Sequence, residues 1–391
     1  MSGIVGVDVD AVREQLPVTG RLAYLNTGTA GPLPLATADA MREAAEAELT
    51  EGRIGMSGFL ELFERLDRLR AALAGYVGAD ASEIGLTHNT TEGMNVGLWG
   101  VDWKPGDAVV TTTLEHGGGL LPLYQLHRRR GVDVRFVAAG NGERELVLEG
   151  MRRAIEPGVR VVAVSHVSYQ TGAVLPLREI TAMAHEVGAM VVVDGAQSVG
   201  AIPVDMHELG VDVYAIPGQK WLCGPEGTGA VFVRRDRWDD VETTYVGGFG
   251  VDHHSFRADQ VGFAPAEGAR RYEVGSVYRP SMLGLAASVA WLAGLGGTHA
   301  AIQDLVAYCL SRLADVPGAE LLSPRQAEMS GLVAVRIPDI DVERCLEFLG
   351  EHAVAIRSIP ENGALRISCG FFNTREEIDR TLALLEEFRR M

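Results

Sequence analysis

Short runs of apolar and β-branched residues alternate with amphipathic segments through the middle of the chain. The apolar runs predict strands at 107–112, 133–138, 159–166, 188–194, 211–217 and 228–234. The segments at 121–130, 146–155 and 177–187 have the period of helices. Near-continuous apolar strands are typical of a mostly parallel sheet that is buried on both faces. The pattern therefore predicts an α/β fold, an open sheet that binds ligands at the carboxyl ends of its strands.

The pattern changes after about residue 280. It predicts helices and strands at 282–295, 331–337, 341–351 and 364–369, and a last helix that Thr374 and Glu377 open as a capping box. We expect two domains, a large one at 1–275 and a smaller α+β domain at 276–391. We also expect the N-terminal segment to pack near the active site and the small domain.

Composition and charge exclude several classes of function. The 391 residues include 35 Lys and Arg against 52 Asp and Glu, a net charge of −17, which argues against a nucleic-acid partner. No apolar run reaches the roughly 18 residues of a membrane span, and the first ten residues carry acids where a signal peptide carries positive charge. The four cysteines have neither zinc-site nor disulfide-framework spacing. We therefore expect a cytoplasmic protein with no metal site and no membrane partner.

Asp194 and Lys220 are the residues that most strongly indicate a cofactor. Asp194 ends one predicted strand, and Lys220 follows the end of the next one, ahead of a glycine-rich run at 224–229. Pyridoxal phosphate requires an amine that forms a Schiff base with its aldehyde and an acid that keeps its pyridine nitrogen protonated. Each residue alone has an ordinary alternative, a buried strand-end acid or a solvated lysine. Together with the glycine-rich run they favour pyridoxal phosphate.

A phosphate site is predicted at the start of a helix. Asn89 is a suitable N-cap with a glutamate three residues later, so the N–H groups of Thr90 and Thr91 would point toward an anion. His116 follows a predicted strand and precedes three glycines, where a flat imidazole can stack on a pyridine ring. Most N-caps bind nothing and loop histidines are common, so both interpretations depend on the cofactor motif.

Arg366 is a candidate for binding a substrate carboxylate. In the predicted strand around it, Leu365, Ile367 and Cys369 share the apolar face, which leaves Arg366 on the other face. There it can point into the cleft between the domains and bind a carboxylate with two hydrogen bonds. A surface arginine on an edge strand is the alternative, and the sequence leaves both open.

Taken in order, these motifs resemble those of the class V aminotransferase-fold enzymes, which include cysteine desulfurases, selenocysteine lyases, isopenicillin N epimerase-like proteins and cystine C–S lyases. The resemblance covers nearly the whole chain from Tyr24 onward. It is carried by Asn89-Thr90-Thr91-Glu92, Glu115-His116, Ser165-His166, Thr171-Gly172, Asp194-Gly-Ala-Gln197, Lys220 with its glycine-rich tail, and Arg366 with Asn373-Thr374. The segments at 98–103, 245–247 and 267–273 are most similar to the cystine C–S lyases. It implies a homodimeric fold-type I enzyme, dependent on pyridoxal phosphate, with a small amino-acid substrate.

The resemblance also implies roles around the cofactor ring. Lys220 would be the Schiff-base lysine and the acid–base group at the substrate Cα. Asp194 would pair with the pyridine nitrogen, Gln197 would hydrogen-bond the ring hydroxyl, and His116 would stack on the ring.

At the phosphate, the resemblance assigns Thr90 and Thr91 together with Ser276, which would reach over from the second subunit. Two positions depart from the family pattern. Pro217 stands where Ser or Thr is usual and Gln219 where His is usual. Proline has no hydroxyl to donate, whereas the Gln219 amide still donates but carries no charge.

On the substrate side, the resemblance assigns the α-carboxylate to Arg366 and the lining to Asn26, Thr27 and Gly28. Cysteine desulfurases carry a nucleophilic cysteine on a loop shortly before this arginine, and the stretch 357–366 has none. We therefore expect a lyase that cleaves the C–S bond of cystine or a cysteine S-conjugate or sulfoxide by β-elimination, giving pyruvate and ammonia. A class V epimerase or aminotransferase is the alternative, and a non-catalytic module with the same fold is a third.

Overall fold

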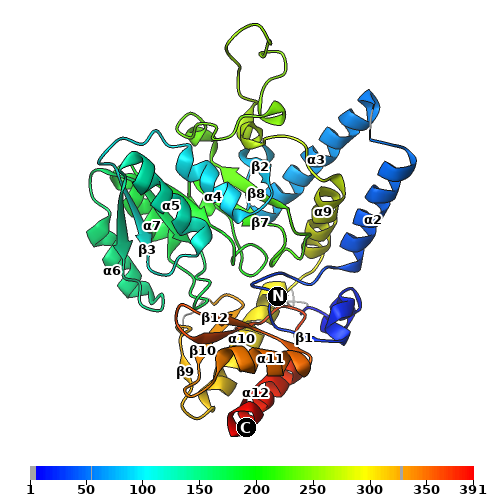
Figure 1. Cartoon of the computed structure of the whole chain (residues 1–391), viewed down its shortest axis with the longest axis vertical. Coiled ribbons are helices and arrows are strands. Elements are labelled where there is room, and N and C mark those ends of the chain that lie inside the picture. Colours follow the sequence, from blue (N-terminus) through cyan, green and yellow to red (C-terminus); the bar gives the residue numbers. More distant parts are fainter. Residues whose placement is uncertain (1–5, 54, 326–328) are drawn as a thin grey trace, which may run out of the picture.

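The computed structural model describes residues 6–53, 55–325 and 329–391. Figure 1 shows a large sheet with helices on both sides, and below it a smaller sheet with helices beside it. The N-terminal helix α1 (Val9–Glu14) lies beside this smaller part, far in sequence from the C-terminal helix that it approaches.

The large sheet has seven strands in the order β2-β8-β7-β6-β5-β3-β4. All neighbouring strands are parallel except those that pair with β8, which is antiparallel to β7 and to β2. The strands are β2 (Ile84–Thr87), β3 (Ala108–Thr112), β4 (Asp133–Val137), β5 (Val159–Ser165), β6 (Met190–Asp194), β7 (Val213–Pro217) and β8 (Gly229–Val233). The six strands predicted from the apolar runs are all present, and the predicted α/β fold with a mostly parallel sheet is confirmed.

The central strands β6 and β7 are apolar at every position except Asp194, so both faces of the sheet require apolar cover. In β6, Val191 and Val193 join the apolar cluster under α6 and α7, whereas Val192 joins the cluster under α4 and α5. This is the alternation that a pleated strand imposes. The covering helices are α4 (Thr90–Trp99), α5 (Gly117–Arg130), α6 (Arg144–Ala154), α7 (Leu177–Glu186) and the short α8 (Met206–Leu209).

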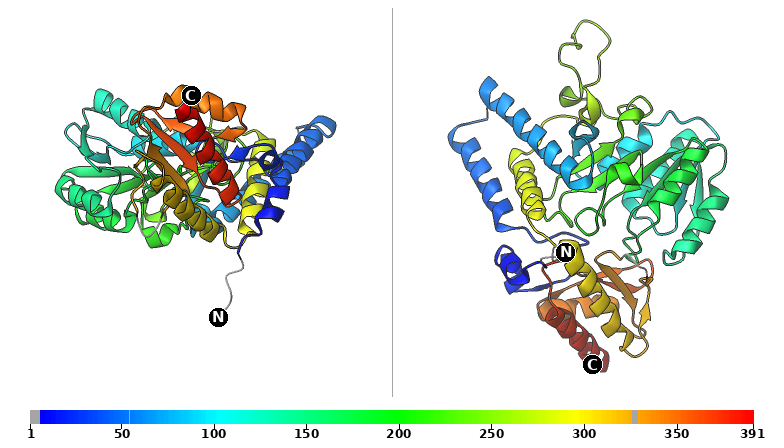
Figure 2. Two further views of the ribbon diagram at one scale, coloured as in Figure 1. Left: turned by 90° about the horizontal axis from the view of Figure 1, so that it is seen from below. Right: turned by 180° about the vertical axis from the view of Figure 1, so that it is seen from behind.

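Two long helices precede this sheet in sequence and were not predicted. α2 (Leu35–Thr50) and α3 (Met56–Val77) both pack against α9 (Arg279–Ala293), and Figure 2 shows the three beside the large sheet from behind. Short 3-10 helices occupy Pro17–Gly20, Ala81–Glu83, Arg235–Arg237, Gly248–Gly250 and Gly268–Tyr272. The segment between the last two projects at the top of Figure 1.

The smaller part is built on a four-stranded antiparallel sheet in the order β12-β13-β10-β9. Its elements are β9 (Glu320–Leu321), β10 (Leu332–Arg336), β12 (Arg357–Ile359), β13 (Ala364–Ser368), α10 (Thr298–Ala314), α11 (Val342–Glu351) and α12 (Arg375–Arg390). Thr374 and Glu377 form the predicted capping box of α12.

The N-terminal segment connects to this part through main-chain and side-chain bonds. β1 (Ala23–Tyr24) pairs in parallel with β11 (Val354–Ala355), and Arg13 forms a 2.9 Å ion pair with Glu377. The division of the chain at residue 275 stays a prediction. Within the described residues, no single helix is long and apolar enough to cross a membrane, although α9 and α10 together would pass on length and composition with a 79° bend between them.

Candidate active site

The carboxyl ends of three neighbouring strands bring the predicted cofactor residues together. Ser165 at the end of β5 pairs in register with Asp194 at the end of β6, and Asp194 pairs with Ala215 in β7. Lys220 follows β7 after a short turn, close enough to Asp194 for the carboxylate to act on its pKa. Asp194 is buried and accepts a 2.9 Å hydrogen bond from the Ala196 N–H. Sheet topology therefore places the acid and the lysine at one edge, as ligand sites in open α/β sheets require.

Lys220 has the electrostatic environment of a base. Burial lowers its pKa to about 8, the positive charges of Arg366 and Arg357 lower it as well, and Asp194 opposes them. An ordinary lysine is almost fully protonated near neutral pH, whereas this amine is neutral in a substantial fraction of molecules at pH 8. It is therefore suited to attack an aldehyde or to accept a proton.

The N-termini of α4 and α5 meet at the same edge of the sheet. The Asn89 side chain caps α4 by accepting the Glu92 N–H at 3.0 Å, which leaves the first N–H groups of the helix directed outward. A Cβ atom at Gly118, in the first turn of α5, would lie 2.7 Å from Thr91 Oγ1, so the glycine lets the two helix ends approach. Thr90 is buried and Thr91 is exposed. Two adjoining helix N-termini suit a phosphate.

His116 caps α5, and its ring is held by two contacts. Its Nδ1 accepts the Gly118 N–H at 3.0 Å, and the ring meets the edge of Tyr169 at 4.9 Å between centroids. Burial and the nearby positive charge of Lys220 lower the pKa of His116, so the imidazole is neutral near pH 7. Because Nδ1 accepts a hydrogen bond, the proton of the neutral ring lies on Nε2.

Behind His116, Glu115 links two strands of the sheet. Its carboxylate accepts hydrogen bonds from Thr112 Oγ1 (2.5 Å) and from the N–H and hydroxyl of Ser165 (2.7 and 2.5 Å). Burial raises the pKa of Glu115 to about 7, and these hydrogen bonds oppose the shift. The residue therefore fixes the loop that carries His116 relative to the end of β5.

The segment 26–28 lies between both parts of the molecule. Gln197 Nε2 donates to the Gly28 carbonyl at 2.8 Å, and the Gly28 N–H donates to Ser368 Oγ at 3.1 Å. Gln197 Oε1 accepts from Trp221 Nε1. Because Nε2 carries two hydrogens and donates one of them to Gly28, its second hydrogen is left for a ligand. Asn26 accepts a 2.7 Å bond from the Thr29 hydroxyl.

Arg366 is among the most deeply buried charged groups, with 1% of its surface exposed. Its Nη1 donates to the Tyr169 carbonyl at 3.1 Å and its Nη2 to Thr29 Oγ1 at 3.4 Å. β13 is an inner strand, and Ser368 on the same face reaches Gly28, so the alternative of a surface arginine on an edge strand is wrong. Burial, reinforced by the charge of Arg357, lowers the pKa of Arg366 to about 9, and the group stays charged at neutral pH.

Unpartnered polar atoms test whether these residues fit pyridoxal phosphate. Among the described side chains, eight buried polar atoms lack a hydrogen-bond partner, and three of them belong to predicted site residues: Gln219 Oε1, Thr27 Oγ1 and Arg366 Nε. Buried polar groups normally find partners, so unpartnered atoms on predicted site residues favour a polar ligand there. A phosphate at the helix N-termini, a ring beside Asp194 and an amino-acid carboxylate at Arg366 supply such partners. The residues present fit the cofactor and its amino-acid substrate.

Ser276 is a predicted site residue for which the described part of the chain shows no hydrogen bond to another predicted site residue. It is exposed, in the stretch between the 3-10 helix Gly268–Tyr272 and α9. Its assignment to the phosphate of a second subunit stays a prediction.

Sequence reasoning gave no role to Arg357, Tyr169 or Glu361, which the fold brings to the site. Tyr169 donates its hydroxyl to Glu361 at 2.8 Å, and Arg357 lies opposite Arg366 in the sheet. Glu361 belongs to the four-residue turn, 360–363, that joins β12 to β13. The signal in the sequence was the short spacing between Arg357 and Arg366, but the strand pairing was needed to interpret it.

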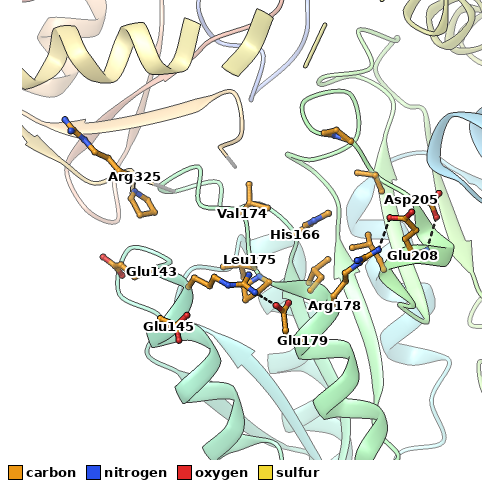
Figure 3. Close-up of a pocket in the computed structure, with 17 residues that line it drawn as sticks. Glu143, Glu145, His166, Val174, Leu175, Arg178, Glu179, Asp205, Glu208 and Arg325 are labelled. Carbon is orange, nitrogen blue, oxygen red and sulfur yellow. Dashed lines mark hydrogen bonds and ion pairs between the residues drawn. The ribbon is translucent and has the colours of Figure 1, made fainter. Parts of the chain in front are cut away.

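A cavity of about 930 Å³ lies elsewhere, between the starts of α6 and α7, α8 and the stretch 324–325 (Figure 3). None of the site residues predicted from the sequence lines it. Its charged groups largely neutralise one another, since Arg178 pairs with Glu208 at 2.8 Å and Arg144 with Glu179. Its lining lacks the unpartnered buried groups found around Lys220.

Comparisons with known proteins agree with this geometry. A model of the aminotransferase class-V family matches residues 23–381. The chain is 31% identical to a probable cysteine desulfurase 2 of Mycobacterium leprae over 407 aligned positions, 96% of each chain. Among solved structures, the cystine C-S lyase C-DES with its reaction product cysteine persulfide is 30% identical, with a TM-score of 0.90 over 96% of this chain and 100% of that one. An apo cysteine desulfurase from Thermococcus onnurineus NA1 is 26% identical, with a TM-score of 0.88 over 98% of each chain. The chain therefore belongs to the aminotransferase class V family and is an enzyme of the cysteine desulfurase and C–S lyase group that depends on pyridoxal phosphate.

Proposed function

We propose that this enzyme is a C–S lyase that acts on cystine or another cysteine derivative by β-elimination. The observation that carries the proposal is the connection between β12 and β13. In a desulfurase, a mobile loop at this place would carry the cysteine that accepts sulfur. Here the connection is a turn of four residues, and it contains no cysteine. The four cysteines of the chain, Cys223, Cys309, Cys345 and Cys369, are all buried and unpaired. Burial raises the pKa of Cys223 to about 12, which disfavours a thiolate beside Lys220.

The chain's own residues account for each step of an elimination. When bound, pyridoxal phosphate supplies an electron-accepting ring that makes the substrate Cα proton acidic. Arg366 binds the α-carboxylate, Asp194 holds the positive charge of the ring nitrogen, and Lys220 Nζ accepts the Cα proton. The electron pair of the C–H bond forms a Cα–Cβ double bond as the Cβ–S bond breaks and sulfur leaves with its bonding pair. The released enamine hydrolyses to pyruvate and ammonia.

The product distinguishes elimination from sulfur transfer. Transfer of sulfur to a protein thiol leaves the carbon skeleton as alanine, whereas elimination gives pyruvate. Purified protein supplied with pyridoxal phosphate should release pyruvate from at least one of cystine, cysteine, cysteine sulfoxides and S-conjugates. Lys220→Ala should abolish release, and Cys223→Ala should leave it nearly unchanged. Alanine with a trapped protein persulfide would instead identify a desulfurase, and deuterium exchange at Cα without either product would favour an epimerase.

We propose in addition that the enzyme is a homodimer in which Ser276 of the partner subunit completes the phosphate site. Large apolar side chains are exposed along the stretch 245–278, which includes Ser276, among them Tyr245 (65%), Val261 and Tyr278 (61%). Exposed apolar groups gathered on one segment favour a protein interface. Light scattering should give twice the chain mass, and Ser276→Ala should weaken cofactor retention without changing that mass.

The unpaired cysteines favour a reducing compartment, such as the cytoplasm, as the location of the enzyme.

A further inference from the structure

A hydrogen bond between Tyr169 and Glu361 joins the two parts of the molecule at the site. The Tyr169 hydroxyl donates to Glu361 Oε1 at 2.8 Å. Tyr169 follows β5 of the large sheet, whereas Glu361 lies in the turn 360–363 of the small sheet. The other hydrogen bonds of this turn stay within the small sheet, such as the 3.0 Å bond from Arg336 Nε in β10 to the Asn362 carbonyl. Among the described residues, Tyr169 is therefore the one residue of the large part that holds the turn through a hydrogen bond.

Tyr169 also contacts two of the groups that would surround a substrate. Its ring meets the His116 ring edge-on, with 4.9 Å between the centroids and 90° between the planes. Its main-chain carbonyl accepts a 3.1 Å hydrogen bond from Arg366 Nη1. Only 7% of Tyr169 is exposed, and its ring packs in an apolar cluster of the small part that consists of Leu322, Ala334, Ile359 and Ala364. Tyr169 therefore forms a buried wall beside His116 and Arg366.

Glu361 is the outer end of this hydrogen bond. It is exposed whereas Tyr169 is buried, so the bond lies at the boundary between the site and solvent. Partial burial opposes ionisation of Glu361, but a main-chain hydrogen bond, the Tyr169 hydroxyl and the charge of Arg357 hold its pKa below the ordinary value. The carboxylate is therefore ionised at neutral pH, and a hydrogen bond to an ionised acceptor is stronger than one between neutral groups. Because its acceptor lies on an exposed turn, the bond can open without unpacking the buried ring.

The four substituents of an amino-acid Cα define where the sulfur of a substrate would lie. The amine would bind the cofactor, the proton would face Lys220 and the carboxylate would bind Arg366. One direction is left for the side chain that carries sulfur, and it points away from Lys220 because Cα is tetrahedral. Tyr169 contacts both His116 and Arg366, so it borders this direction. Its bond to Glu361 closes that border toward solvent.

We propose that Tyr169 and Glu361 form a clasp that limits the size of the group bound to the substrate's sulfur. The inference rests on the proposed C–S lyase function and narrows its substrates to compact cysteine derivatives. A small group fits behind the closed clasp, whereas a large aromatic group requires the bond between Tyr169 and Glu361 to open. Opening costs the free energy of that hydrogen bond, so conjugates with a large group have a lower kcat/KM.

The kinetic test compares S-methylcysteine sulfoxide with S-benzylcysteine sulfoxide, which differ only in the size of the group on sulfur. Tyr169→Phe and Glu361→Ala both remove the bond. Each should raise kcat/KM for the benzyl substrate, relative to the methyl substrate, by about threefold to tenfold, the range of one net hydrogen bond. Glu361→Gln keeps an acceptor oxygen and should stay near the wild-type ratio. Tyr308→Phe is the matched control, because it removes a similar bond to Asp379 between α10 and α12.

A binding test keeps this inference separate from the proposed reaction. Butyrate and 4-phenylbutyrate share a carboxylate and differ by one aromatic ring, and calorimetry on the holoenzyme needs no turnover. Tyr169→Phe and Glu361→Ala should each raise the affinity for 4-phenylbutyrate about threefold to tenfold and leave that for butyrate within about twofold.

The outcomes separate the clasp from other roles. An equal change for both ligands would overturn the proposal and assign Tyr169 to the positioning of Arg366, and no change for either would overturn it as well. Absence of pyruvate from every substrate would refute the lyase function, whereas the calorimetric preference would still support or refute the clasp. Because Tyr169→Phe keeps the buried ring, its Tm should stay within a few °C of the wild type, which excludes misfolding as the cause.

Discussion

Gly28 is the position where one added methyl group should change substrate binding most specifically. A Cβ atom there would lie 2.9 Å from Arg366 Nη2, 3.1 Å from its Cζ and 2.8 Å from Leu332 Cδ2. The backbone angle of Gly28 is one that alanine adopts, so the perturbation in Gly28→Ala is steric. Arg366 is tethered through Nη1 to the Tyr169 carbonyl, and its guanidinium group must rotate or shift away from the new methyl.

The expected magnitude follows from the contacts that the shift would break. A hydrogen bond to a charged group contributes about 1.5–3 kcal/mol, and 1.4 kcal/mol corresponds to tenfold in affinity. Loss of one of the two bonds from Arg366 to a carboxylate should therefore raise KM by about tenfold to a hundredfold. The change in kcat should be smaller, because Lys220 and Asp194 are not touched. Overpacking against Leu332 should cost about 1–3 kcal/mol of stability.

Steady-state kinetics with the best substrate, and calorimetry with butyrate as a single carboxylate, measure this effect. Gly350→Ala is the matched control, since a Cβ at this exposed position in α11 meets nothing within 4 Å. It should leave KM unchanged and stabilise the helix by about 0.5–1 kcal/mol. A folded Gly28→Ala protein with wild-type KM and butyrate affinity would refute the assignment of Arg366 to the carboxylate.

Three further predictions concern charge and burial. Glu273→Ala should lower the free energy of unfolding by about 3 kcal/mol, measured by urea titration, because the buried Arg70 loses its bonds of 2.8 and 2.6 Å to Glu273 and keeps only the one to the exposed Asp67. Arg70→Met in the same chain should recover part of the loss. Covalent uptake of pyridoxal phosphate by cofactor-free protein should speed up with pH to about pH 8 and then level off, since the neutral amine of Lys220 reacts; a rate that keeps rising toward pH 10 would contradict the lowered pKa. Burial raises the pKa of Glu115 to about 7 in the folded protein, so its contribution to stability is fully present below about pH 4.5 and is lost as the pH rises through 7. The Tm of the wild type, measured relative to that of Glu115→Gln, should therefore fall by a few °C between pH 5 and pH 7.5.

The sequence was sufficient for six of the seven strands of the large sheet, because the composition of these strands reports their burial, whereas the edge strand β2 was not predicted. The continuous valines of β6 are explained only by apolar cover on both faces, and Asp194 breaks that run at its carboxyl end. The short distance between Asp194 and Lys220 then followed from parallel topology alone. The N-cap at Asn89 and the capping box at Thr374 were likewise local signals, which need no tertiary contact to be recognised.

What could not be predicted depends on contacts between distant segments. α2 and α3 were not predicted, although they are long and pack on α9. The side-by-side placement of Arg357 and Arg366 depends on the length of the 360–363 turn, which fixes strand register. The bond between Tyr169 and Glu361 joins residues that are 192 positions apart, and no periodicity reports such a pair.

The path of the N-terminal segment suggests why substrate binding and domain placement are coupled in this enzyme. The peptide unit at Gly28 is bonded on one side to Gln197 beside the large sheet and on the other to Ser368 in β13. Arg366, two residues before Ser368, approaches the same glycine and extends to Tyr169 after β5. A carboxylate bound at Arg366 would therefore contact a group whose position is set by three segments that are far apart in the sequence. The cofactor lysine follows β7 and belongs to none of these segments. A small movement of the small sheet would therefore change the fit of the substrate while Lys220 and Asp194 keep their geometry.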